Sequence, residues 1–411
     1  MDNFTVTERE LTLAQAEQRI DAEFKVLGLR LNTRTIGQKV VATHASVSTI
    51  DPERRARGAG KGYPPQANVG ALYEALEHYL SDHCDTSTTE LITPEYFSEC
   101  PLFHDDTVLA LIEKQKNTVI ACRTYTNAID QSPFYYPKAL CSPGYPGTLF
   151  SADTTHCHSL QRYASNSGTA VGASYNEAVL HAINESIERD AVSLFLLQHF
   201  YYENRPPLRR IARLPDDDDL GRLWSDAESE IDAEIILVDI SNEFLPRTFL
   251  AFSLASCTFP RVFGTGCSLM ARHGAWRALT ELVQMHHGAS EHEVKHYLIN
   301  AERHLTHFPR LLRCLRFDLH PLLNLCEQQF VALPTAHDER PLAEQINLLA
   351  EDLHRHGRTL GITQLHQTEL GTTLVNVVIP GLERFFIVSS GNVVIPQARG
   401  RRLENPQGVP A

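Results

Sequence analysis

The clearest pattern in the chain is a helical repeat of apolar positions between residues 175 and 197. Leu180, Ile183 and Ile187 recur at the spacing that places side chains on one face of a helix. An almost unbroken apolar run follows at 191–197 and extends the same helix. We therefore predict one long helix here, lying at the centre of the core.

Shorter segments with the same period predict three more helices, and runs of apolar and β-branched residues predict strands between them. Because helices and strands are interspersed and no repeat or low-complexity linker divides the chain, we expect an α+β fold in one large domain, residues 1–411, with mixed or antiparallel sheets. Residues 289–370 are helix-rich and charged and are expected to form a peripheral elaboration, and residues 396–411 a tail rich in Pro, Gly and Arg. The predicted helices are 8–27, 71–77 and 275–285, and the predicted strands are 40–48, 118–125, 234–240, 249–255, 374–379 and 385–388.

Acidic side chains accompany the apolar stripe of the long helix. Glu177, Glu185 and Glu188 are eight and then three residues apart, so they project toward roughly the same side. Crowded carboxylates on a core helix repel one another and resist losing water. A divalent cation such as Mg²⁺ would remove that cost, and Arg189 could reach an anion held by the same metal. The pattern indicates a metal and phosphate site.

A second segment repeats this design. Glu74 and Glu77 stand three residues apart beside an apolar stripe, and the Gly-rich segment 58–62, which contains Lys61, precedes them. We expect this segment to be a loop whose glycines let backbone N–H groups approach phosphate oxygens. It is not a Walker A motif, and taken alone it is explained more readily as a simple turn.

Each acidic helix also has an ordinary explanation. Glutamates on a single amphipathic helix usually form a solvated face. A third helix, however, carries Glu281 and Gln284 beside its own apolar stripe. Three helices that each place polar groups against apolar neighbours favour one joint site.

The same residues resemble the YcaO family, whose members use ATP to activate peptide backbone amides. The resemblance covers residues 58–383 in family order, and Gly70 and His78 depart from the family pattern. It implies a central, glutamate-lined ATP site with Mg²⁺ in place of a P-loop. The matching blocks are 60–62 with 71–77, 165–172 with 177–189, 264–266 with 275–284, and 377–383. By resemblance, Mg²⁺ is held by Glu74, Glu77, Glu185 and Glu188; the nucleotide is contacted by Lys61, Gly62, Glu74, Glu77, Glu177, Glu185, Glu188, Arg189, Glu281 and Gln284; and Glu188 and Arg189 are catalytic.

The resemblance also implies an activity and partners. The expected enzyme is a cyclodehydratase that converts Cys, Ser or Thr of a ribosomally made precursor peptide to thiazoline or oxazoline rings. Formation of a thioamide or amidine, and a non-catalytic nucleotide-binding scaffold, remain alternatives. The expected partners are the precursor peptide, an E1-like leader-binding protein and, where rings are oxidised, an FMN-dependent dehydrogenase in the same synthetase complex. Some azoline-forming members end in a proline-rich tail that reaches the active site, which makes Pro410 a candidate catalytic position; a disordered end is the alternative.

Composition narrows the remaining classes. A net charge of −13 and the lack of a basic patch argue against binding to nucleic acid. No apolar run is long enough to span a membrane, and the N-terminus does not resemble a signal peptide, so we expect a cytoplasmic protein. The nine cysteines form no Cys-x-x-Cys pair and are expected as free thiols. A zinc site at 156–158 has no second half and is disfavoured.

Overall fold

The computed structural model describes residues 8–51, 53–142, 153–254, 262–289, 292–335 and 340–404. Its strands form a three-stranded antiparallel sheet in the order β1-β2-β3, a five-stranded sheet in the order β11-β10-β9-β8-β12, and a six-stranded sheet in the order β4-β5-β13-β14-β7 with β6 beside β5. Only the pairing of β8 with β12 is parallel among these strands. The bounds are β1 Arg30–Ile36, β2 Val41–Ser48, β3 Arg55–Gly62, β4 Thr89–Ile92, β5 Ile120–Asn127, β6 Pro133–Pro137, β7 Thr169–Gly172, β8 Leu208–Ile211, β9 Ile235–Asp239, β10 Arg247–Ser253, β11 Phe263–Ser268, β12 Gln328–Val331, β13 Gly361–Gln367 and β14 Thr373–Val378.

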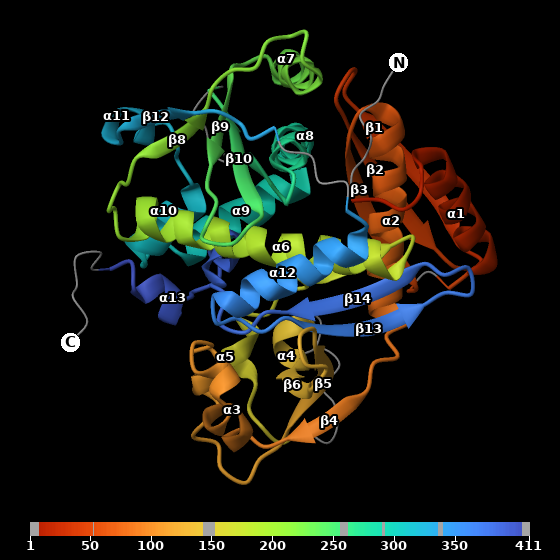
Figure 1. Cartoon of the computed structure of the whole chain (residues 1–411), viewed down its shortest axis with the longest axis vertical. Helices are drawn as coiled ribbons and strands as arrows, with labels where there is room; N and C mark the ends of the chain where they lie inside the picture. The colour runs from red at the N-terminus through yellow and green to blue at the C-terminus, as the bar shows by residue number, and fades with distance from the viewer. Residues whose placement is uncertain are drawn as a thin grey trace.

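The long helix α6 crosses the middle of the molecule, as the sequence predicts (Figure 1). The five-stranded sheet lies on one side of it and the six-stranded sheet on the other, while the three-stranded sheet and α2 lie toward its N-terminal end. Its buried residues belong to two of the hydrophobic clusters of the core. The helices are α1 Leu13–Val26, α2 Pro64–His83, α3 Glu95–Glu99, α4 Lys138–Cys141, α5 His158–Gln161, α6 Tyr175–Leu196, α7 Asp219–Ile231, α8 Ala271–Ala289, α9 His292–His304, α10 Pro309–Arg316, α11 Leu322–Leu325, α12 Leu342–Arg355 and α13 Ala398–Arg401, with a π-helical turn η4 at Leu197–Tyr201 and 3₁₀ turns η1 at Pro101–Phe103, η2 at Leu109–Leu111 and η5 at Phe385–Ser390.

Glycines in two strands bring helices unusually close to the sheets. A Cβ atom on Gly60 of β3 would lie 1.9 Å from the carbonyl oxygen of Ala67 in α2, and one on Gly264 of β11 would lie 2.2 Å from that of Ala278 in α8. The backbones of helix and strand are therefore in direct contact. The predicted Gly-rich loop 58–62 is wrong, because these glycines belong to β3 and serve helix packing.

Two other expectations are corrected. Residues 385–388 form the turn η5 and no strand. The Phe386 N–H donates to Ser193 Oγ of α6 at 2.9 Å, so this apolar run packs against the side of that helix. Residues 289–370 are helix-rich but not peripheral, because β13 lies between β5 and β14 and α12 packs in the cluster that contains α6. A charged outer face conceals this burial in the sequence.

The remaining chemistry agrees with expectation where it is described. The cysteines in the described ranges are free thiols, most of them buried. No helix among these residues is long and apolar enough to cross a membrane. Pro410 lies outside the described residues.

Candidate nucleotide and magnesium site

Charged side chains from three helices and one strand meet beside the middle of α6. Glu74 and Glu77 come from α2, Glu185 and Glu188 from α6, and Glu281 from α8. They are close enough to shift one another's pKa, since Glu185 and Glu74 raise that of Glu77, and Glu188 raises that of Glu185. The sequence prediction that these distant acids converge agrees with this arrangement.

Direct contacts hold the cluster together. Lys61 of β3 forms an ion pair with Glu281. The hydroxyl of Thr265 in β11 donates to Glu188 Oε1 at 2.7 Å and lies 3.4 Å from Glu281 Oε1. A guanidinium nitrogen of Arg189 lies 3.6 Å from Glu185 Oε1. Two cations and one hydroxyl therefore fix the positions of three carboxylates.

The pKa shifts follow from burial and neighbouring charge. Burial, with added negative charge from Glu185 and Glu74, holds the pKa of Glu77 well above its usual range. Burial also raises the pKa of Glu185, which Arg189 partly offsets. Burial acts in the same direction on Glu281, but Lys61 and Arg189 outweigh it and leave the pKa of Glu281 below its usual value. The helices thus carry more partly desolvated carboxylates than the neighbouring cations can neutralise.

The carboxylates keep oxygen atoms available for a cation. The backbone N–H of Ala59 donates to one oxygen of Glu74 at 3.2 Å, and that of Val171 donates to one oxygen of Glu77 at 3.0 Å. Glu188 is 2% exposed and its Oε2 is buried without a hydrogen-bond partner. A buried carboxylate oxygen without a donor fits a hard cation such as Mg²⁺.

The ligand set itself stays a prediction. In the described part of the chain, no three Asp, Glu, His or Cys side chains surround one point as metal ligands would. In place of a metal ion, Lys61 lies against Glu281 and Arg189 lies against Glu185. These two cations partly neutralise the acids.

Three predicted residues are placed apart from these contacts. The carboxylate of Glu177 accepts the backbone N–H groups of Glu10 at 2.6 Å, Leu11 at 3.3 Å and Ala173 at 3.3 Å, so it fastens the segment before α1 to the start of α6. Gly62 has a φ of 121° and lies where a Cβ atom would meet the ring of Trp276 at 2.9 Å. Gln284 is half-buried on α8, three residues beyond Glu281.

Two residues of the site escaped the sequence analysis. Arg277, one turn before Glu281 on α8, lies 3.1 Å from His181 Nδ1 and lowers the pKa of both Glu185 and Glu281. Thr265 joins Glu188 to Glu281. The spacing of four residues between Arg277 and Glu281 is a signal for the first, because it places both on one helix face. Thr265 gives no such signal, since its role depends on how β11 lies against α6.

A family model described as "YcaO cyclodehydratase, ATP- and Mg²⁺-binding" matches residues 59–383. The chain belongs to the YcaO family. ATP and Mg²⁺, predicted from the sequence, are the cofactors that this family is described as binding. No curated protein matches this chain significantly.

Solved structures with the same fold include nucleotide-bound and substrate-bound relatives. YcaO from Methanopyrus kandleri bound with AMPPCP and Mg²⁺ is 15% identical, with a TM-score of 0.66 and 94% of each chain covered. A heterocyclase in complex with substrate and cofactor is 17% identical, with a TM-score of 0.63; 92% of this chain covers 54% of that one. The E. coli microcin synthetase McbBCD complex contains a chain 11% identical, with a TM-score of 0.54 and coverage of 86% and 88%. These likenesses confirm the α+β fold of this YcaO protein.

Proposed function

We propose that this YcaO protein is an ATP-dependent cyclodehydratase that phosphorylates a backbone amide oxygen of a precursor peptide and converts Cys, Ser or Thr to an azoline ring. The observation that carries the proposal is the cluster of half-buried Glu74, Glu77 and Glu185 with buried Glu188, beside Arg189. A cluster of this kind suits a magnesium nucleotide.

The reaction balances with ATP as the only co-substrate. A side-chain hydroxyl or thiol adds to the carbonyl carbon that precedes it, and the former carbonyl oxygen takes the terminal phosphoryl group while ADP leaves. Phosphate then departs and the amide nitrogen gives up its proton, which forms the C=N bond of the ring. ATP converts a poor leaving group into a good one.

The residues of this chain act by holding charges in place. We assign the Mg²⁺ ligands to Glu74, Glu77, Glu185 and Glu188; when bound, the ion would neutralise phosphate oxygens. Arg189 is held by Glu185 and packs 5.4 Å from the centre of the Phe386 ring. We assign its guanidinium the role of offsetting charge on the transferred phosphoryl group. We assign contacts with the rest of the nucleotide to Lys61, Gly62, Glu177, Glu281 and Gln284.

The related structures suggest partners through their length and their assembly. The chain spans about half of the heterocyclase that it matches, with 54% of that chain covered. The microcin synthetase relative is described as part of a multi-chain complex. We therefore propose a separate E1-like protein that binds the leader of the precursor, a flavin-dependent dehydrogenase where rings are oxidised, and assembly of the complex in the cytoplasm around one YcaO domain.

Mass spectrometry of a peptide co-expressed with this protein and its partner tests the proposal. Short reading frames beside the gene supply the candidate precursors, and each ring should remove the mass of one water. Replacement of oxygen by sulfur would indicate a thioamide, and exchange for an amine an amidine. The Glu188→Ala and Arg189→Ala variants should fold and leave the peptide unmodified. An unmodified peptide with the wild type, despite ATP binding, would support a scaffold instead.

A further inference from the structure

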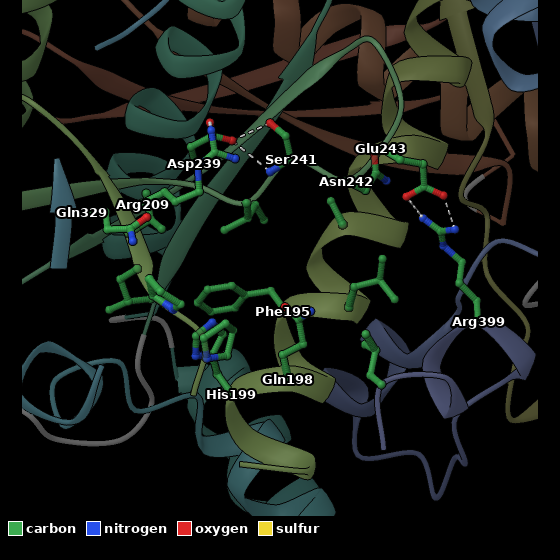
Figure 2. Close-up of a pocket in the computed structure, with 18 of the residues that line it drawn as sticks. Phe195, Gln198, His199, Arg209, Asp239, Ser241, Asn242, Glu243, Gln329 and Arg399 are labelled. Atoms are coloured by element: carbon green, nitrogen blue, oxygen red, sulfur yellow. Dashed lines mark hydrogen bonds and ion pairs between the residues drawn. The ribbon is translucent and has the colours of Figure 1, made fainter. Parts of the chain in front are cut away.

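A cavity of about 480 Å³ lies beside the C-terminal half of α6. In Figure 2, Phe195 and Gln198 line one side of it, and the segment from Asp239 to Glu243 after β9 lines the other. Val238, Ile240 and Leu208 add apolar surface. Its volume and mixed lining are those of a pocket for a small organic group.

The helix connects this cavity to the glutamate cluster. Phe195 follows Glu188 by seven residues, which turn a helix by ~700° and so return within ~20° of the same direction, about 10 Å further along the axis. Ala191, which also lines the cavity, lies between them on this face. Glu188 and the cavity therefore share one side of α6.

The five-stranded sheet gives the same separation independently. Thr265 of β11, which binds Glu188, pairs with Leu250 of β10, and Leu250 pairs with Val238 of β9. Directly paired residues lie on the same face, and two strand spacings amount to ~10 Å. An extended peptide rises about 3.3 Å per residue, so ~10 Å corresponds to about three residues.

The charged groups at the cavity are already paired. Arg209 lies 3.1 Å from Asp239, and Arg402 lies 3.1 Å from Asp105. Arg399 pairs with Glu243, and its Nε lies 2.9 Å from Asp190 (Figure 2). A charged guest would break these pairs or lose its water without compensation.

The groups left to meet a guest are neutral. Gln198 is half-buried, and its side chain has no hydrogen-bond partner among the residues described. Burial lowers the pKa of His199 to about 4, so this lining imidazole is uncharged at neutral pH. Phe195 packs against it, with ring centres 4.4 Å apart.

We propose that this cavity is a specificity pocket for an uncharged, apolar side chain of the peptide substrate, about three residues from the amide that is activated. The inference rests on the proposed function, because it takes Glu188 as the mark of the reacting centre. It adds a sequence preference: precursors carry an aliphatic or aromatic residue at this distance from the modified Cys, Ser or Thr.

Two synthetic peptides test the pocket without knowledge of the natural precursor. The first is acetyl-Leu-Gly-Gly-Cys-Gly-Gly-Leu-amide, which offers leucine three residues from cysteine in both chain directions; the second has aspartate in place of both leucines. With AMPPCP and Mg²⁺ present, calorimetry should show the leucine peptide binding at least ~10-fold more tightly than the aspartate peptide. Equal affinities, or no binding of the leucine peptide, would overturn the pocket.

A variant with a matched control locates the site. Gln198→Trp fills the cavity and should lower the affinity for the leucine peptide at least ~10-fold, while the affinity for AMPPCP changes less than ~2-fold. Gln161→Trp replaces another half-buried glutamine, on α5 away from the cavity, and should bind like the wild type. Unchanged peptide affinity in a folded Gln198→Trp protein would also overturn the pocket. Failure of the proposed function would differ: the leucine peptide would still bind, but co-expressed precursors would keep their mass.

Discussion

The carboxyl group of Glu77 is held in an environment that disfavours its charged form and so lowers the stability of the fold. Burial and the charges of Glu185 and Glu74 keep the pKa of its carboxyl group well above the usual range. Its one described backbone donor, the Val171 N–H, does not offset this. A group held at such a cost is expected where function needs it.

Glu77→Gln should therefore separate stability from nucleotide binding. The amide oxygen of glutamine can still accept the Val171 N–H, while the crowded negative charge is gone. We expect the free energy of unfolding to stay the same or rise by up to about 2 kcal/mol. The affinity for AMPPCP with Mg²⁺ should fall at least ~10-fold. Urea unfolding and calorimetry measure the two quantities, and a destabilised variant with full nucleotide affinity would contradict the assignment.

The sequence predicted single residues well where one helix carries them. The spacing of Glu185 and Glu188 was enough to foresee a shared side of α6, and the charge of Glu188 raises the pKa of Glu185. It could not show that Glu177 turns to the backbone of residues 10 and 11, because that contact spans more than 160 residues. The link from Thr265 to Glu188 was hidden for the same reason.

At the scale of elements, β3 and α2 form the support of the first two carboxylates. The close approach at Gly60 sets the depth of α2 and hence the position of Glu74, whose carboxylate accepts the N–H of Ala59 in the same strand. A loop would satisfy the same glycine-rich composition, which is why the sequence alone was misleading here. Likewise, the apolar run 385–388 is too short for its period to distinguish a strand from a helical turn.

Gly60→Ala should disturb this support. The new methyl group would meet the Ala67 carbonyl and the Ala71 backbone nitrogen at 1.9 and 2.4 Å, so α2 must move outward. We expect a loss of about 2–3 kcal/mol in the free energy of unfolding and weaker nucleotide binding. Gly70→Ala is the control: its Cβ finds only an ordinary 3.6 Å contact, and the helix should gain about 0.5–1 kcal/mol. Chemical denaturation distinguishes them, and equal effects would mean that the approach at Gly60 is not tight.

For the whole molecule, buried neutral histidines contribute to the loss of stability in acid. Burial lowers the pKa of His199 from 6.5 to about 4 and that of His273 from 6.5 to about 3. Between pH 6.5 and 4 the unfolded chain binds protons at these sites that the folded chain does not. The contribution of these histidines to the free energy of unfolding is therefore fully present above pH 6.5, and it is lost as the pH drops toward 4.

His199→Phe should reduce this pH dependence. One proton fewer taken up on unfolding lowers the slope of unfolding free energy against pH by up to about 1.4 kcal/mol per pH unit between pH 6 and 4.5. His104→Phe, at an exposed position, should keep the slope of the wild type. Urea titrations at several pH values measure the slopes, and parallel curves for all three proteins would refute a neutral, buried His199.

A crystal structure with AMPPCP and Mg²⁺ would decide whether the glutamate cluster binds the metal and the nucleotide. We expect metal density bound by carboxylate oxygens of Glu74, Glu77, Glu185 and Glu188, with the phosphates next to Arg189 and Lys61. Nucleotide bound elsewhere, with these four side chains still paired only to protein groups, would contradict it.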